Sequence, residues 1–350
     1  MVVRQLQRPN SDNRGLTELF SKSKVRSPIN ARWLGNTIDP MRVKLVKGAL
    51  AAAASMALIV SFGNAAVAAN ELANPGISNQ VQKNVSPVRG QAGKPKPVAN
   101  TGISYHSGPV MVNPITIYPI WYGNFSSGTA SSTKDILTHF MSNIGGSPYY
   151  NITTTYTNGS GAKVKNQVTL STKSVVDNYS LGTNLTDANI ATLVNNAING
   201  GTFPRDPDGF YLVLTAGDVG ESSGFLTNYC GWHTYTSNNA VAIKYSFVGD
   251  ATKGLGSCTA QSTNSPNGNP AADGMVSVIA HELEEAASDP QLNAWYDTRG
   301  YENADKCAWN FGTQSTATNG SKYNMTLGGK QYLVQQNWVN AGSGGCLMSY

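Results

Sequence analysis

The sequence predicts an α+β fold in which a single domain is built around a mixed β-sheet. Three observations support this prediction. Strand patterns and helix patterns alternate along the chain, as in sheets that are covered by helices. Residues 209–215 are nearly all apolar, which is typical of a central strand buried on both faces. From His106 to Tyr350 the chain has roughly 245 residues, enough for one large domain with a sizeable core.

Four elements are predicted in the first half of this domain. Residues 115–121 are apolar and β-branched and predict a strand, in which Pro119 favours an edge position or a bulge. Residues 133–144 have apolar side chains at helical spacing and predict an amphipathic helix. Residues 151–172 are rich in Thr, Tyr and Val and predict a hairpin or meander with an Asn-Gly turn. Residues 186–198 again show helical spacing and predict a second helix.

The second half continues with the apolar strand 209–215 and a further strand at 240–247. Residues 257–273 are polar and rich in Asn, Pro and Gly, and predict a loop. A helix is predicted from about residue 274 to residue 288, because Pro290 cannot continue it. Residues 331–339 predict the final strand.

Residues 1–68 are interpreted as a leader that contains a secretory signal peptide. Basic residues precede an apolar run at 48–62, and small residues follow up to an Ala-x-Ala site at 66–68. This run is too short to span a bilayer comfortably, although a retained signal anchor is the alternative interpretation. Both Met1 and Met41 are candidate start sites, and the signal is well formed from the second. We therefore expect a secreted, extracellular protein, located in the cell wall or in a bacterial periplasm, with no stable membrane span after cleavage.

The charge of the chain is concentrated in this leader. It holds 10 of the 25 Lys and Arg residues but 3 of the 20 Asp and Glu residues, which leaves 15 basic and 17 acidic residues beyond it. The mature part therefore has no basic surplus, and we expect no nucleic-acid partner. Residues 69–105 contain Pro, Gly, Asn and Lys but few large apolar residues, and predict a flexible, disordered linker before the domain at 106–350.

Four cysteines lie beyond the leader, and an even number in an exported chain favours two disulfides. The order along the chain suggests a bond between Cys230 and Cys258 and another between Cys307 and Cys346, but four cysteines allow three pairings. The alternative is a set of reduced or metal-binding thiols. The sequence contains no Cys-x-x-Cys pair, which argues against a thiolate metal site.

The predicted helix at 274–288 carries the most informative group of residues. His281 and Glu285 are four residues apart, so they share one face of a helix and can hold one metal ion. Glu282 then lies beside whatever the ion binds. The pattern resembles the helical motif of zinc peptidases, with the second histidine replaced by glutamate. The sequence therefore predicts a zincin-like active-site helix with zinc as the cofactor.

Zinc takes about four ligands, so others must come from elsewhere in the chain. Glu302 and Asp305 are three residues apart and can face one point from a helical turn. His233 is a further candidate ligand, and Trp295 and Tyr296 are candidates for lining the cleft.

Two functions are compatible with these residues. In a metal-dependent hydrolase that acts on peptides, the ion would acidify a bound water and Glu282 would act as the general base. Two carboxylate ligands would weaken that acidification, which favours modest activity or a structural ion. Alternatively, Glu284 and Glu285 form a solvated helix face, His281 is a core histidine, and the protein is a non-enzymatic extracellular protein. A peptide or a cell-wall component is the expected partner, and the sequence leaves the oligomeric state open.

Eight stretches of the domain carry a family resemblance: YHSGPV (105–110), IYPIWYG (117–123), YSLGTNLT (179–186), YLVLTAGDV (211–219), CGWH (230–233), VIAHEL (278–283), NAWY (293–296) and KQYLVQ (330–335). Together they resemble the EXORDIUM-like family, also called phosphate-induced protein 1. The resemblance implies a secreted or cell-wall protein, linked in plants to growth, whose biochemical activity the family does not define. Members of the family in plants carry additional cysteines before the cysteine motif at 230–233 and a Cys-x-Trp-Pro-Phe stretch after it. This chain has Phe225-Leu226 and an Asn- and Ser-rich loop at 259–270 in their place.

Overall fold

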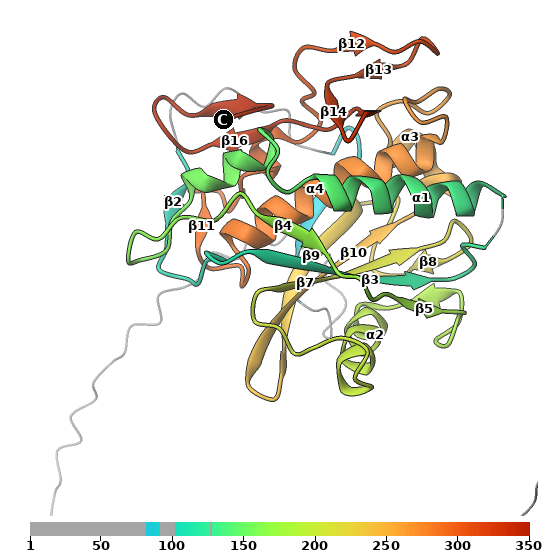
Figure 1. Ribbon diagram of the computed structural model, residues 1–350, viewed down its shortest axis with the longest axis horizontal. Helices are drawn as coiled ribbons and strands as arrows, with labels where there is room; N and C mark the ends of the chain where they lie inside the picture. Colours follow the sequence, from blue (N-terminus) through green and yellow to red (C-terminus); the bar gives the residue numbers. More distant parts are fainter. Residues whose placement is uncertain (1–81, 92–101, 127) are drawn as a thin grey trace, which may run out of the picture. The chain divides into compact units, whose positions relative to one another are not determined.

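The computed structural model describes residues 82–91, 102–126 and 128–350 (Figure 1). The predicted leader and most of the predicted linker lie outside these residues. Within the described part, none of the helices combines the length and the apolar character that crossing a membrane requires.

A seven-stranded mixed sheet forms the centre of the domain, as the sequence predicts. Its strand order is β1-β9-β10-β7-β3-β4, and β5 also pairs with β3 beyond the end of β4. The strands from β10 to β4 are parallel, whereas β1, β9 and β10 pair antiparallel. The strands are β1 (Asn84–Pro87), β3 (Ile115–Tyr122), β4 (Val168–Leu170), β5 (Val175–Asp177), β7 (Gly209–Thr215), β9 (Tyr229–Asn238) and β10 (Val241–Gly249).

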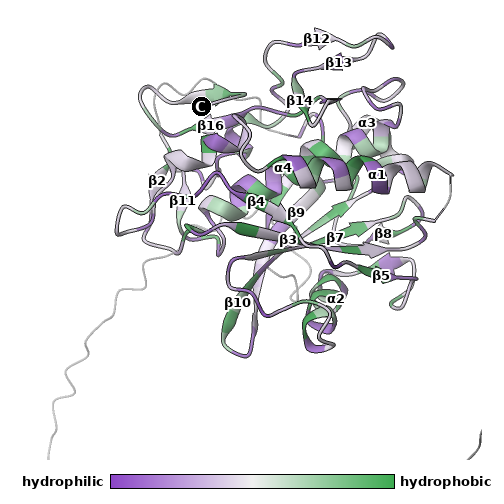
Figure 2. Ribbon diagram, in the orientation of Figure 1, coloured by the Kyte–Doolittle hydropathy of each residue, from purple (hydrophilic) through white to green (hydrophobic). Residues whose placement is uncertain are grey.

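Helices cover both faces of this sheet (Figure 1). Helices α1 (Gly128–Asn143) and α4 (Pro270–Ser288) lie on one face, and α2 (Asp187–Asn199) lies on the other. Side chains alternate along β7: Phe210 and Leu212 join the core under α1 and α4, while Tyr211 and Val213 join the core under α2. Burial on both faces explains why residues 209–215 form an almost continuous apolar run. Figure 2 shows this run as hydrophobic colouring in the middle of the sheet.

Pro119 lies inside the sheet, and neither an edge strand nor a bulge surrounds it. Strand β3 pairs with β7 on one side over its length. On the other side it pairs first with β4, up to Ile117, and then with β5, from Ile120. Pro119 therefore falls at the gap between two short partner strands, where the missing N–H removes no ladder hydrogen bond on that side.

Short ribbons and single turns complete the fold. They are β2 (Ser104–Tyr105) with β11 (Trp295–Tyr296), β6 (Asn184–Leu185) with β8 (Gly220–Glu221), β12 (Ser315–Thr316) with β13 (Lys322–Tyr323), β14 (Met325–Leu327) with β15 (Lys330–Tyr332), β16 (Asn337–Val339) with β17 (Gly345–Leu347), and the turns η1 (Tyr150–Thr155), η2 (Ala251–Gly254), α3 (Leu255–Cys258) and η3 (Asp305–Cys307).

Three predicted elements differ in the structure. The hairpin expected at 151–172 begins with the 3₁₀ turn η1, because Thr hydroxyls there bond back to carbonyls three residues earlier. The final strand expected at 331–339 is divided into β15 and β16. Helix α4 begins at Pro270, four residues before the predicted start, because Asn269 caps it and proline suits the first helical position.

The predicted linker is wrong for residues 84–87, which form strand β1 at the edge of the sheet, and for residues 104–105, which form strand β2. Asn84 and Val85 pair with His233 and Trp232 of β9. Beyond the strand, Trp309 Nε1 donates a hydrogen bond to the Pro87 carbonyl. A four-residue strand ending in proline has too little periodicity to be recognised in sequence, so its conformation is set by the partner strand.

Both predicted disulfides are present. Cys230 is bonded to Cys258 and Cys307 to Cys346, as their order along the chain suggests. The first bond joins the start of β9 to α3, and the second joins η3 to β17.

Helix α4 is buried on nearly all sides, which contradicts the interpretation of Glu284 and Glu285 as a solvated face. Seventeen of its residues are buried, and these include His281 and three glutamates. The sheet lies under the helix, while α1 and the chain around η3 contact it from other directions. The charged residues of α4 therefore need partners within the protein, which a solvated helix would not require.

Candidate metal centre

Six titratable side chains meet between α4, β9 and the turn that leads into η3. Helix α4 contributes three of them, at positions i, i+1 and i+4, and the side chains at i and i+4 lie on one face of the helix. Strand β9 contributes one from the sheet, and the turn contributes two that are three residues apart. The six are His281, Glu282 and Glu285 from α4, His233 from β9, and Glu302 and Asp305 from the turn and η3.

The first group in this centre consists of His281, Glu285 and Asp305. His281 Nε2 lies 3.0 Å from Glu285 Oε1 and 3.5 Å from Asp305 Oδ1. Ligands about 2.0–2.1 Å from a tetrahedral zinc ion are about 3.3–3.4 Å from one another, so these separations suit three ligands of one ion. One atom from each residue can be chosen so that all three lie within 4.8 Å of one another.

Gln335 orients the imidazole of His281. Its Nε2 lies 2.6 Å from His281 Nδ1, and both residues are buried. The same amide nitrogen donates a hydrogen bond to the Ala304 carbonyl at 3.3 Å, so the nitrogen of Gln335 and not its oxygen faces His281. A ligating histidine commonly donates its other N–H to an oxygen, so an ion at His281 Nε2 would require the Gln335 amide to rotate. Gln335 also lines a surface pocket, together with Ser277, Trp309 and Phe311.

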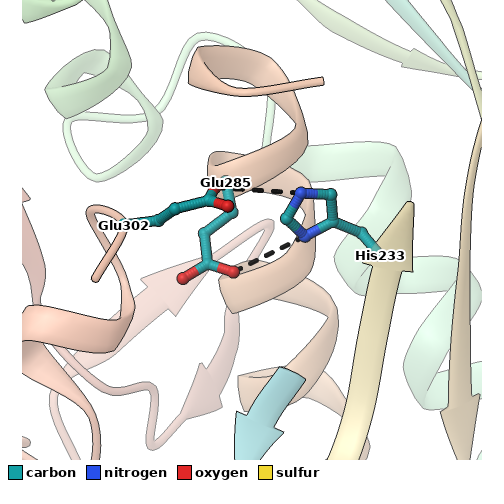
Figure 3. Close-up of side chains that lie close together, drawn as sticks. All are labelled: His233, Glu285 and Glu302. Atoms are coloured by element: carbon teal, nitrogen blue, oxygen red, sulfur yellow. Dashed lines mark ion pairs between the residues drawn. The ribbon is translucent and has the colours of Figure 1, made fainter. Parts of the chain in front are cut away.

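The second group consists of His233, Glu285 and Glu302, and it also satisfies the 4.8 Å criterion. Figure 3 shows the two carboxylates facing different nitrogens of the His233 ring. His233 Nδ1 lies 3.5 Å from Glu285 Oε2, and Nε2 lies 3.8 Å from Glu302 Oε2. Glu282 Oε2 is 3.2 Å from the same Nδ1.

Glu285 is common to both groups and lies between them. Its Oε1 faces His281 and accepts a hydrogen bond from the Asp305 backbone N–H at 3.0 Å. Its Oε2 faces His233 and accepts a hydrogen bond from Asn84 Nδ2 at 3.0 Å. Asn84 also donates to Asp305 Oδ2 at 3.2 Å, so strand β1 covers this side of the centre.

Several polar atoms of the centre are buried and lack a hydrogen-bond partner among the described residues. They include His281 Nε2, Glu282 Oε1 and Glu302 Oε2. The contacts of His281 Nε2 and Glu302 Oε2 given above are short enough for ion pairs but lack hydrogen-bond geometry. Buried unpaired polar atoms are costly, so their concentration at one place favours a ligand there.

The charges within the centre shift the pKa values of its members strongly. Burial lowers the pKa of His233, but the carboxylates of Glu282 and Glu285 outweigh burial and raise it to about 10. Burial raises the pKa of Glu285, but the two neighbouring imidazoles outweigh burial and hold this pKa at about 2. Burial raises the pKa of Glu282 to about 7. Burial, with repulsion from neighbouring carboxylates, raises the pKa of Glu302 well above its usual value. A group of acids that repel one another this way would be stabilised by a bound cation.

The structure brings together most of the residues that the sequence singled out, but in a different grouping. Glu302 lies beside His233, whereas Asp305 lies beside His281, so the two carboxylates do not face one point. Trp295 and Tyr296 pack in the β2–β11 ribbon: the indole of Trp295 donates to the Thr157 carbonyl, and Tyr296 stacks on a histidine ring.

Sequence reasoning missed Asn84 and Gln335. Asn84 lies in the segment predicted as a linker, and its contact with Glu285 spans 201 residues of sequence, so no local signal could have identified it. Gln335 lies within the stretch 330–335, which carries part of the family resemblance, and its place in that stretch is the signal in the sequence that could have identified it.

Comparison with known proteins supports the resemblance to the EXORDIUM-like, or phosphate-induced protein 1, family. The family described as "Phosphate-induced protein 1 conserved region" matches residues 103–347. The chain is similar to Protein EXORDIUM-like 3 of Arabidopsis thaliana, with 31% identity over 67% of this chain and 80% of that protein. It is also similar to Protein EXORDIUM-like 5 of Arabidopsis thaliana, with 32% identity over 67% of this chain and 75% of that protein. Protein PHOSPHATE-INDUCED 1 of Nicotiana tabacum is 27% identical over 56% of this chain and 68% of its own length. No solved structure matches significantly.

Proposed function

The chain belongs to the phosphate-induced protein 1 family, and from that premise we propose that it is an exported protein whose domain binds a divalent cation. The ligands in this proposal are His281, Glu285 and Asp305. In this proposal the ion stabilises the domain by joining helix α4 to the turn at η3. The protein acts outside the cell on a peptide or a cell-wall component, and this role does not require catalysis.

One observation carries the proposal. His281 Nε2 is fully buried, lies 3.0 and 3.5 Å from two carboxylate oxygens, and makes no aligned hydrogen bond among the described residues. A cation between these three atoms would satisfy all of them. An imidazole ligand with carboxylates suits zinc better than calcium or magnesium, which prefer oxygen ligands throughout.

The burial of the ligands favours a stabilising ion over a catalytic one. A catalytic zinc site keeps one position open to water or substrate. Here the side chains of His281 and Glu285 are 0% exposed and that of Asp305 is 7% exposed. The disulfide between Cys307 and Cys346 also holds η3, so the ion and the disulfide would act on the same segment.

Export is part of the proposal. It is supported by the pattern of a signal peptide in residues 41–69 and by two disulfides, which persist in oxidising compartments.

Metal analysis of the purified, oxidised chain from residue 69 onward tests the proposal. We expect at least one zinc ion per chain and a lower melting temperature after chelation. The variant His281→Ala should lose this ion, whereas His139→Ala, which removes a histidine of α1 outside the centre, should keep it. A wild-type protein without metal, whose melting is unchanged by chelators and by added zinc, would contradict the proposal.

A metal-dependent hydrolase is the second candidate, and Glu282 is the residue that favours it. Its pKa of about 7 suits a general base at neutral pH, and its Oε1 has no hydrogen-bond partner among the described residues. In a hydrolase, Glu282→Gln should keep the metal and lower peptide hydrolysis by about 100-fold or more. Glu284→Gln is the matched control on the same helix and should leave hydrolysis unchanged. Absence of hydrolysis by the metal-loaded wild-type protein would leave the stabilising ion as the function of the centre.

A further inference from the structure

We propose that the centre binds two divalent cations, with the carboxylate of Glu285 bridging them. The second ion occupies a subsite formed by His233, Glu285 and Glu302 (Figure 3). This inference rests on the proposed function, because the two ions share Glu285.

The second subsite brings three candidate ligands together, with Glu285 facing Nδ1 and Glu302 facing Nε2 of His233, so that one ion can use one of these two nitrogens. His233, Glu285 and Glu302 can each offer one atom such that the three atoms lie within 4.8 Å of one another. Their side chains come from three separate elements, β9, α4 and the turn before η3, and they are exposed by 0%, 0% and 4%. Such convergence from distant parts of the chain requires the tertiary fold, so local charge clustering on one helix does not explain it.

Unpartnered atoms supply a second, independent observation. Glu302 Oε2 is buried, lies 3.8 Å from His233 Nε2, and has no hydrogen-bond partner among the described residues. Glu282 Oε1, next to the subsite, is buried and also unpartnered. An ion between His281 and Asp305 would leave Glu302 Oε2 unsatisfied, because this atom faces His233.

The position of Glu285 supports a bridge. Its Oε1 faces the imidazole of His281 and its Oε2 faces the imidazole of His233. A carboxylate that offers one oxygen to each of two ions holds them about 3.5–4 Å apart in two-metal sites. Glu285 thus lies between the two imidazoles, and an ion bound at His233 Nε2 beside Glu302 would require Oε2 of Glu285 to turn away from Nδ1.

The charge count is compatible with two ions. Ionised Glu282, Glu285, Glu302 and Asp305 carry four negative charges, and one divalent ion would leave two of them uncompensated in a buried site. Two divalent ions balance the four charges while both imidazoles stay neutral, as ligands must be. The competing arrangement is a single ion or none, with protons on the imidazoles and carboxylates balancing the charge.

Metal stoichiometry separates these arrangements. The oxidised chain from residue 69 onward is stripped with a chelator and titrated with Co²⁺ by calorimetry, and bound metal is then counted by mass spectrometry. We expect two ions per chain for the wild type, one for His233→Ala and for Glu302→Gln, and none that persists through desalting for Glu285→Gln. The control Glu284→Gln should bind two. Spin coupling between two Co²⁺ ions in the electron paramagnetic resonance spectrum should appear in the wild type and vanish in Glu302→Gln.

Each outcome decides the inference. One ion in the wild type that is lost in His281→Ala overturns the second subsite and leaves the proposed function standing. Two ions in both the wild type and Glu302→Gln also overturn it, because the second ion would then lie elsewhere. No ion in the wild type overturns the proposed function as well. Glu302→Gln is nearly isosteric, so circular dichroism of that variant shows whether a lost ion reflects a lost ligand or a lost fold.

Discussion

Glu284 is the most isolated acid of helix α4. It is 1% exposed, and neither of its oxygens has a hydrogen-bond partner among the described residues. It belongs to neither group of candidate ligands. Burial raises the pKa of this carboxyl well above 4.5, so the folded protein favours its neutral form.

Replacing Glu284 with Gln should therefore stabilise the protein at neutral pH. Because the folded-state pKa is raised, the glutamate costs stability as the pH rises above 4.5, the value expected for the unfolded chain. An unsatisfied buried group costs on the order of 1–3 kcal/mol, which corresponds to a melting temperature several degrees higher for Glu284→Gln. Thermal melting at pH 7.5 and at pH 4.5 measures the effect, and the difference between variant and wild type should shrink at the lower pH. A variant that melts lower than the wild type at both pH values would show that Glu284 has a stabilising partner.

Strand β1 shows what a short element can contribute to a site. Its four residues complete one edge of the sheet, and Asn84 donates hydrogen bonds to two candidate ligands, Glu285 and Asp305. The family match begins at residue 103, so this cover lies outside the conserved region while the six titratable residues lie inside it. The six titratable residues therefore lie within the matched region, and Asn84 covers them from the preceding segment.

We expect Asn84→Ala to destabilise the protein by on the order of 1–3 kcal/mol, because two buried carboxylates lose a donor. Gln91→Ala is the control from the same segment: its amide donates to a carbonyl in an exposed position. That control should change stability by no more than about 0.5 kcal/mol. Urea unfolding of both variants provides the measurement, and equal effects would show that β1 contributes only backbone pairing.

The two disulfides close loops of similar length, with sequence separations of 28 and 39 residues. Chain entropy alone predicts that removing either would cost about 3.5–4 kcal/mol. They differ in position, because only the bond from Cys307 holds η3, which carries Asp305.

Paired Cys→Ser variants should separate stability from metal binding. We expect Cys307→Ser with Cys346→Ser to lose stability and also to release metal more easily. Cys230→Ser with Cys258→Ser should lose similar stability while its metal content stays closer to that of the wild type. Chemical unfolding and metal retention during dialysis check this prediction, which fails if both pairs release metal equally.

The centre should make the stability of the whole molecule depend on pH, and bound metal should reverse that dependence. In the metal-free protein, the pKa of His233 is raised from 6.5 to about 10. Protonated His233 therefore contributes fully to the stability of the fold below pH 6.5, and this contribution is lost as the pH rises through 10. The pKa of Glu285 is lowered from 4.5 to about 2, so ionised Glu285 stabilises the fold above pH 4.5, and this stabilisation is lost as the pH falls toward 2. The metal-free protein should be most stable between about pH 4.5 and 6.5.

Zinc changes this profile because ligating histidines must be neutral. The melting temperature with zinc, minus that with chelator, should therefore increase from pH 5 to pH 8. Thermal melting in both conditions across this range provides the test. Profiles that coincide at every pH would mean that zinc does not compete with protons for these side chains.

The sequence alone determined the features that depend on local periodicity and covalent order. Apolar spacing identified α1, α2, β3, β7 and β10, and the order of the cysteines suggested the observed disulfides. The i, i+4 spacing of His281 and Glu285 identified the centre, because a helix brings such residues onto one face whatever surrounds it.

Only the tertiary structure decided how the residues are grouped and what covers them. Glu302 and Asp305 are neighbours in sequence but face different histidines, because α4 and β9 approach their turn from different sides. Strand β1 and Asn84 reach the centre through pairing with β9, a contact that no local pattern encodes. The burial of four carboxylates around two imidazoles arises from packing between distant segments, and the proposed cation rests on that packing.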